Sequence, residues 1–155
     1  MNKETKNDFN SIMSQLDTFF DTYLVKKAPT LPDNIKEVIV KYYPYVIIIS
    51  LIFTLPLILG LLGLSALVAP FAFLGGMRNG VTFSLANISI LVTTVLNTLA
   101  ISGLLKRQFA GWQYLYYSAL VSATFSLLMF NLGSFVIGMA ISMYFLYQIK
   151  SYYKK

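Results

Sequence analysis

The strongest constraint on this chain is the scarcity of charge between residues 42 and 149. That stretch contains no acidic residue and only three basic ones, Arg78, Lys106 and Arg107. Over the whole chain 57% of residues are hydrophobic and 12% are charged, which is about half the charged share of ~25% found in soluble domains. A chain of this kind is expected to be an all-α polytopic membrane protein, because only helices or closed barrels satisfy their backbone polar groups in lipid.

Four uncharged segments predict four transmembrane helices, at residues 45–67, 83–105, 114–129 and 134–149. At ~1.5 Å per residue the first would extend about 35 Å, enough for a hydrocarbon core of ~30 Å. The last two are short and would borrow flanking aromatics or thin the bilayer locally. Pro44 is expected to interrupt a short helix before the first span, and Pro56 to kink that span. Residues 68–82, rich in Gly and Pro, are expected to form a loop with an interfacial or re-entrant part.

The distribution of Lys and Arg predicts the orientation in the membrane. With four spans, the N-terminal region, the turn at 106–113 and the tail share one side, and all basic residues except Arg78 lie there. Most of the Tyr residues and the one Trp fall near the same side. Because basic residues accumulate in cytoplasmic loops, both the N-terminus and the C-terminus are expected to be cytoplasmic.

Residues 1–33 form a cytoplasmic arm and linker ahead of a transmembrane domain at 34–155. Within the arm, residues 8–25 carry apolar side chains at the three-and-four spacing of an amphipathic helix. The opposite face is polar and mildly acidic, without the Lys and Arg that would hold anionic headgroups. Residues 9–24 are therefore expected to contact a protein partner or a second copy; the alternative is that the arm lies on the lipid surface.

Small residues recur at every fourth position on both sides of a turn centred on Phe130. In an antiparallel hairpin the three pairs of small residues come into register together. Small residues allow two helix backbones to approach closely, and serine hydroxyls can bond across the contact. The third and fourth spans are therefore predicted to pack through six positions: Ser118, Ser122, Ser126, Ser134, Gly138 and Ser142.

The second span is the most polar of the four. At 100° per residue, six of its polar side chains fall on one stripe: Ser84, Asn87, Thr94, Asn97, Thr98 and Ser102. Such a stripe is expected to face away from lipid, and interhelical hydrogen bonding is the favoured interpretation over a permeation path. Arg78, beside two Gly-containing bends, is a candidate anion contact, although a lone loop arginine is usually solvated.

The residue types present exclude most catalytic mechanisms and metal sites. The chain has no Cys and no His, which removes the commonest metal ligands, and the apolar body has no acid to serve as a general base or to activate a serine. No catalytic residue, metal site or cofactor is expected, so the protein is predicted not to be an enzyme. It has no basic face with interleaved aromatics, so no nucleic-acid partner is expected either.

Three stretches carry a family resemblance: LPDNIKEVIVKYYPY at 31–45, KRQFAGWQYLYYS at 106–118, and IGMAISMYFLYQIKSYYKK at 137–155. In these the chain resembles a family of small, uncharacterised bacterial integral membrane proteins, which are sometimes labelled chromate transporters. Authentic chromate transporters are much longer, and their motifs are not found here. The resemblance implies a four-helix protein of the bacterial inner membrane and implies no activity.

Two functions are consistent with these patterns. The first, favoured here, is a non-enzymatic scaffold or accessory subunit of a membrane complex, with the bilayer and a protein as its partners. The second is a small oligomeric permease or channel for a small solute or anion, with the polar stripe as its path.

Overall fold

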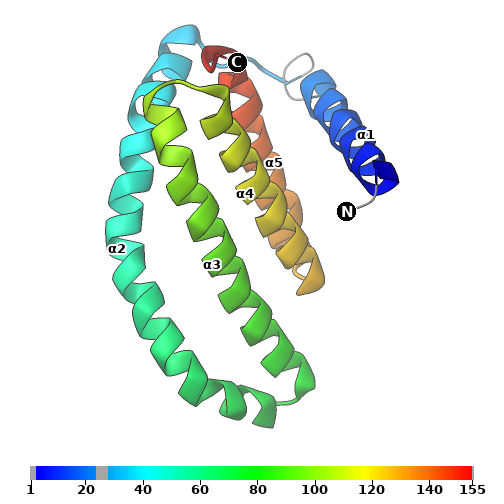
Figure 1. Ribbon diagram of the computed structural model, residues 1–155, viewed down its shortest axis with the longest axis vertical. Coiled ribbons are helices and arrows are strands. Elements are labelled where there is room, and N and C mark those ends of the chain that lie inside the picture. The colour runs from blue at the N-terminus through cyan, green and yellow to red at the C-terminus, as the bar shows by residue number, and fades with distance from the viewer. Residues whose placement is uncertain (1–2, 24–27, 155) are drawn as a thin grey trace.

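The computed structural model describes residues 3–23 and 28–154 and consists of helices (Figure 1). In chain order these are α1 (Lys3–Phe20), α2 (Asp33–Leu74), α3 (Met77–Leu105), α4 (Phe109–Leu128), α5 (Leu132–Ile149) and the short 3-10 helix η2 (Lys150–Tyr152). Among the described residues, three segments are long and apolar enough to cross a membrane: Asp33–Ser65, Met77–Leu105 and Leu132–Tyr152. The protein is thus an all-helical bundle with three candidate membrane spans.

Helix α2 runs unbroken through Pro44, Pro56 and Pro70 over 42 residues. The expectation that Pro44 interrupts the helix is therefore wrong. A proline removes one backbone hydrogen bond, whereas two new helix ends would leave several backbone groups unsatisfied in apolar surroundings. The structure accommodates the prolines by curvature instead, and α2 bows outward along its length (Figure 1).

The link between α2 and α3 consists of two residues, Gly75 and Gly76. Gly76 has a φ of 105°, which L side chains rarely adopt, and the Asn79 side-chain amide donates to the Gly75 carbonyl at 2.8 Å. The expectation of a loop over residues 68–82 is therefore wrong, because a tight turn at the two glycines leaves the rest of the stretch helical. Arg78 lies exposed in the first turn of α3.

Helices α3 and α4 touch backbone to backbone at a pair of glycines. A Cβ built on Gly103 would lie 2.5 Å from the Gly111 nitrogen, and one built on Gly111 would lie 2.4 Å from the Leu104 nitrogen. Both glycines are buried. No side chain fits between the two helices here, so this contact fixes the angle and distance at which α4 leaves α3.

The end of α3 closes in a Schellman motif. The Arg107 N–H donates to the Leu104 carbonyl at 3.0 Å and the Gln108 N–H donates to the Gly103 carbonyl at 2.8 Å, the pairing that satisfies the last carbonyls of a helix. Arg107 occupies the left-handed position with a φ of 51°, where glycine is more common. The turn at Arg107 and Gln108, which closes α3, also brings Gly111 against Gly103.

The end of α4 uses the same motif. Phe130, with a φ of 56°, donates to the Leu127 carbonyl, and the Asn131 N–H donates to the Ser126 carbonyl, both at 2.9 Å. The Asn131 side chain then caps α5 by accepting from the Ser134 N–H at 3.1 Å. The turn between α4 and α5 is consequently short, and the two helices run antiparallel (Figure 1).

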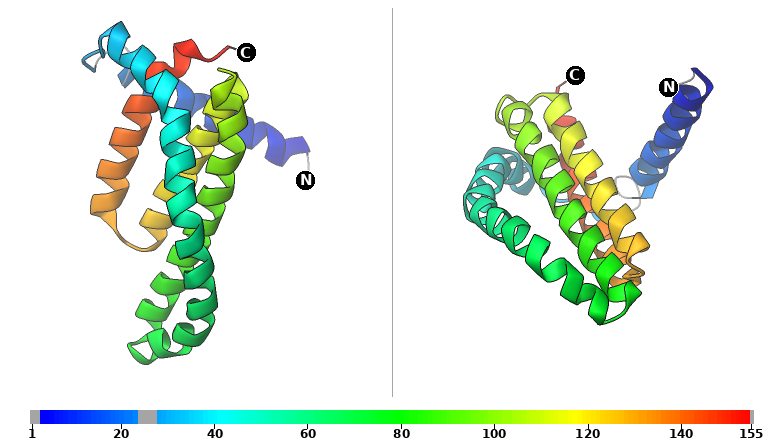
Figure 2. Two further views of the ribbon diagram at one scale, coloured as in Figure 1. Left: turned by 90° about the vertical axis from the view of Figure 1, so that its left-hand side faces the viewer. Right: turned by 60° about the horizontal axis from the view of Figure 1, so that its bottom comes forward.

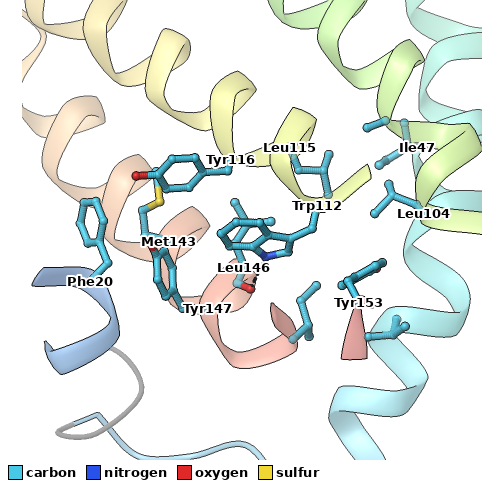
Figure 3. Packing of buried hydrophobic residues seen from close by; sticks show 13 residues of the cluster. Phe20, Ile47, Leu104, Trp112, Leu115, Tyr116, Met143, Leu146, Tyr147 and Tyr153 are labelled. Carbon is cyan, nitrogen blue, oxygen red and sulfur yellow. Dashed lines mark hydrogen bonds between the residues drawn. The ribbon is translucent and has the colours of Figure 1, made fainter. Parts of the chain in front are cut away.

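The hydrophobic core lies at the end of the bundle where α3 meets α4 and where α5 ends (Figure 3). It is built mainly from large aromatic and aliphatic side chains of α4 and α5, with contributions from α1, α2, α3 and the C-terminal tail: Phe20, Val40, Ile47, Ala100, Leu104, Trp112, Leu115, Tyr116, Met143, Leu146, Tyr147, Ile149 and Tyr153. At the opposite end α2 and α3 extend past the turn between α4 and α5 (Figure 1). The bundle is therefore tightly packed at one end only.

Helix α1 meets the packed end through its C-terminal part. Phe20 is buried, and Met13 and Leu16 pack partly against the core. The N-terminal part of α1 points away from the bundle (Figure 2). The arm helix expected over residues 8–25 is thus seen as a helix at Lys3–Phe20, and Leu24, an expected apolar anchor, lies outside the described residues.

We expect Gly103→Ala and Gly111→Ala each to lower the melting temperature strongly, because a methyl group would have to push two backbones apart. Overpacking of this kind typically costs about 1–3 kcal/mol. Circular dichroism melting in detergent measures the effect. Gly138→Ala is the matched control, since a Cβ there would meet nothing within 4 Å; a loss at Gly138 as large as at Gly103 would contradict this packing.

Candidate functional site

A cleft of about 570 Å³ lies between the first turns of α2 and the packed ends of α3, α4 and α5. Apolar side chains make up most of its wall, among them Ile39, Leu115, Leu146 and Ile149. Five of the polar side chains that reach it come from three helices: Thr93, Asn97, Ser118, Ser122 and Ser142. This mixture is typical of a small-ligand site, where a few polar groups fix the orientation of a mostly apolar molecule.

The predicted polar stripe of α3 does not line one continuous surface. Ser84 and Asn87 donate to the carbonyls of Gly80 and Phe83, at 3.0 and 2.9 Å, so their polar groups are used within their own helix. Asn97 alone of the six predicted stripe residues reaches the cleft. The remaining three are spread between half-buried and exposed positions: Thr94 is half-buried, and Thr98 and Ser102 are exposed.

The six small residues of α4 and α5 lie in different surroundings. Ser118 is buried and Ser126 is half-buried, whereas Ser122, Ser134, Gly138 and Ser142 are exposed in the isolated chain. A Cβ added to Gly138 would meet no atom within 4 Å, so the close backbone contact of this bundle lies between α3 and α4 instead. Three of the serines line the cleft: Ser118, Ser122 and Ser142.

A polar cluster holds α1 against the end of α5. The Asp17 carboxylate accepts hydrogen bonds from the Tyr147 hydroxyl and from Lys150 Nζ, the latter at 2.7 and 2.9 Å to its two oxygens. Lys150 Nζ also lies 5.0 Å from the centroid of the Trp112 ring and 4.8 Å from that of Tyr147, within reach of a cation–π interaction. Phe20 completes the contact, with its ring centroid 5.7 Å from that of Tyr147.

This cluster was not predicted from the sequence. Asp17 belongs to the polar face of the arm, and Lys150 to a basic tail more than a hundred residues later. Charge spacing along a chain gives no information on such a distant pair. The burial of Phe20 against Tyr147, one turn along from Asp17, brings the two charges together only after the helices have packed.

Trp112 links α4 to α5 inside the core. Its ring is buried, and its Nε1 donates to the Leu146 carbonyl at 2.7 Å, as the dashed line in Figure 3 marks. Trp112 also stacks on Phe109 and Tyr116 at centroid distances of 5.2 and 5.4 Å. Because Leu115 and Leu146 form part of the cleft wall, the indole lies directly behind that wall.

The C-terminal residues close the same end of the bundle. The Phe109 N–H donates to the Lys154 carbonyl at 2.7 Å, and the Lys154 N–H donates to the Arg107 carbonyl at 3.0 Å. Burial raises the pKa of the neighbouring Tyr153 to about 12. The tail is thus fixed to the corner between α3 and α4, so Lys106, Arg107, Lys150 and Lys154 share one end of the bundle, and Arg78 lies at the other.

The described residues provide no group of three or more His, Cys, Asp or Glu side chains that could hold a metal ion. The cleft itself is lined by neutral residues. What it can offer chemically is hydrogen bonding by hydroxyl and carboxamide groups beside an apolar wall.

We expect Asp17→Asn to loosen α1 from the bundle. An isolated helix of this length is marginal in water, so α1 depends on docking, and the half-exposed ion pair contributes about 1 kcal/mol at most. Hydrogen exchange of the α1 amides should accelerate by about fivefold in low salt and by less in high salt. Asp21→Asn removes the same charge one turn later and should change nothing; equal acceleration in both variants would contradict the docking.

The chain matches no family model, no curated protein and no solved structure. The resemblance to small bacterial membrane proteins therefore stays a prediction.

Proposed function

We propose that this protein is a non-enzymatic scaffold or accessory subunit of a membrane complex, which crosses the bilayer four times with both termini in the cytoplasm. The observation that carries the proposal is the apolar length of α2 and α3 beyond the α4–α5 hairpin. Residues 42–74 of α2 hold no charge and extend about 50 Å along the helix at ~1.5 Å per residue, against ~30 Å of hydrocarbon.

Lipid alone covers such a length poorly. Tilt and local thickening of the bilayer absorb a mismatch of several ångströms, each at a modest cost. Large side chains near the α2–α3 turn are nevertheless exposed, with 68% of Leu67, 70% of Phe71 and 81% of Leu74 accessible. An apolar surface of this kind, left uncovered by its own chain, is what a subunit of a larger complex presents to its neighbours.

The four-span arrangement is supported by the hairpins. Helix α4 is not among the three candidate spans of the described chain, yet it runs antiparallel to α3 and α5 and is joined to each by a short turn (Figures 1 and 2). If α3 and α5 cross the membrane, the helix packed beside them has to cross as well. The end with Lys106, Arg107, Lys150 and Lys154 would then face the cytoplasm under the positive-inside rule.

Single cysteines introduced into this cysteine-free chain test the topology. We expect Arg78→Cys and Phe130→Cys to react with an impermeant thiol reagent added outside intact cells, because both positions are exposed and lie at the ends opposite the basic cluster. Lys106→Cys should react only after the membrane is opened. Labelling of position 106 from outside would reverse the orientation, and protection of position 130 would remove the α4 crossing.

Alanine substitutions of exposed side chains test the scaffold role. In mild detergent we expect a protein to co-purify with the parent chain and to be lost from the double variant Leu67→Ala with Phe71→Ala, since truncation of large apolar side chains at an interface costs over 1 kcal/mol at hot spots. Ile52→Ala with Phe53→Ala removes equally exposed apolar side chains from the middle of α2 and is the control. Retention of the partner by both double variants would count against the proposal.

A permease remains the second candidate, because Asn97 and three serines meet in one cleft. Reconstitution into liposomes separates the two functions. Flux of a small solute or anion that Asn97→Leu abolishes would favour the permease, whereas a scaffold would leave the liposomes sealed.

A further inference from the structure

The cleft between α2 and the packed ends of α3, α4 and α5 contains polar groups that the protein itself does not use. In the part of the chain that the structure describes, the Asn97 amide and the hydroxyls of Ser118, Ser122 and Ser142 have no hydrogen-bond partner. Ser118 is only 7% exposed. Thr93, by contrast, lines the same cleft and donates to the Ser89 carbonyl at 2.8 Å.

Of these four residues only Ser118 is buried, Asn97 is half-buried, and Ser122 and Ser142 are exposed in the isolated chain. Within a bilayer all four would still lack water as a hydrogen-bond partner. An amide or hydroxyl taken out of water without a partner loses about 1–3 kcal/mol by mutational measures, and the hydrocarbon of a bilayer offers no partner at all. Four such groups from three helices converge on one volume. A molecule in the cleft that both donates and accepts hydrogen bonds would satisfy them together.

The walls restrict the charge and shape of that molecule. Every residue that lines the cleft is uncharged, so a phosphate, carboxylate or ammonium group inside it would have no counter-charge. Ile39, Leu115 and Ile149 provide an apolar surface for a hydrocarbon chain. The rim includes the exposed side chains of Tyr43, Ile141 and Phe145, through which a molecule in the membrane can enter sideways.

We propose that the cleft binds one neutral glycerolipid, an acyl chain that carries an uncharged head with hydroxyl and ester groups. The acyl chain lies along the apolar wall, and the head exchanges hydrogen bonds with Asn97, Ser118 and Ser142. A volume of about 570 Å³ is within the range of sites that enclose a molecule of this size. The binding is independent of whether the protein serves as a scaffold.

The single tryptophan reports on this site. Trp112 is 3% exposed, so lipid around the outside of the bundle quenches it weakly, whereas a brominated chain in the cleft would lie just across Leu115 and Leu146. The full-length protein is reconstituted in phosphatidylcholine nanodiscs and titrated with a monoacylglycerol that carries a dibrominated chain. We expect saturable quenching at a low mole fraction, and recovery of fluorescence when unbrominated monoacylglycerol is added.

Two exposed serines of α5 provide matched variants. Ser142→Leu fills the cleft and should raise the mole fraction for half-maximal quenching at least tenfold, whereas Ser134→Leu makes the same change outside the cleft and should leave it unchanged. Circular dichroism melting verifies that both variants fold. If Ser142→Leu does not fold, competition on the parent protein still tests the proposal, because only a specific site lets unbrominated monoacylglycerol restore the fluorescence.

Three results would overturn the proposal. Quenching that rises linearly with mole fraction, without saturation or competition, means contact with surrounding lipid only. Equal saturation by brominated phosphatidylcholine or by a brominated fatty acid removes the requirement for an uncharged head. Equal effects of Ser142→Leu and Ser134→Leu place the bound lipid elsewhere on the protein.

Discussion

The backbone contact between Gly103 and Gly111 is the constraint on which the rest of the bundle depends. A corner this tight requires two residues without side chains, a helix end closed by Arg107 in the left-handed conformation, and a new helix that starts at once. Trp112 follows Gly111 directly, so the contact that sets the corner also directs the indole into the core. From there its hydrogen bond to the Leu146 carbonyl fixes α5 against α4.

The size of the core side chains explains the cleft. Trp112, Tyr116 and Tyr147 set the separation of α4 and α5 at the packed end, because rings of this size keep two helix backbones apart. Serines one or two turns further along are too short to bridge that separation. They line a volume instead of closing a contact, and the polar groups that would have bonded across the interface are left without partners in the described chain.

Much of the architecture could be predicted from the sequence, since long uncharged segments separated by a few basic residues are typical of membrane-spanning helices. An all-helical bundle with three candidate spans is what the structure has. The predictions of a break at Pro44 and of a loop at 68–82 were wrong. Composition does not reveal that a helix in apolar surroundings bends at a proline more readily than it ends. The site was beyond sequence reasoning for another reason: small-residue spacing predicts that two helices can approach, and only the volume of Trp112 and its neighbours decides whether they do.

The two ends of the bundle differ in what they leave for other molecules. The packed end carries most of the basic residues, the docked α1 and the neutral cleft, whose hydroxyl and amide groups without partners are few and lie close together. The far end carries no charge except Arg78, and the large side chains exposed there are apolar. A small amphiphile can satisfy the polar groups of the cleft through a few directed hydrogen bonds, whereas an exposed apolar surface needs a partner of similar extent. We therefore propose a lipid for the cleft and a protein for the α2–α3 end, and each proposal can fail without the other.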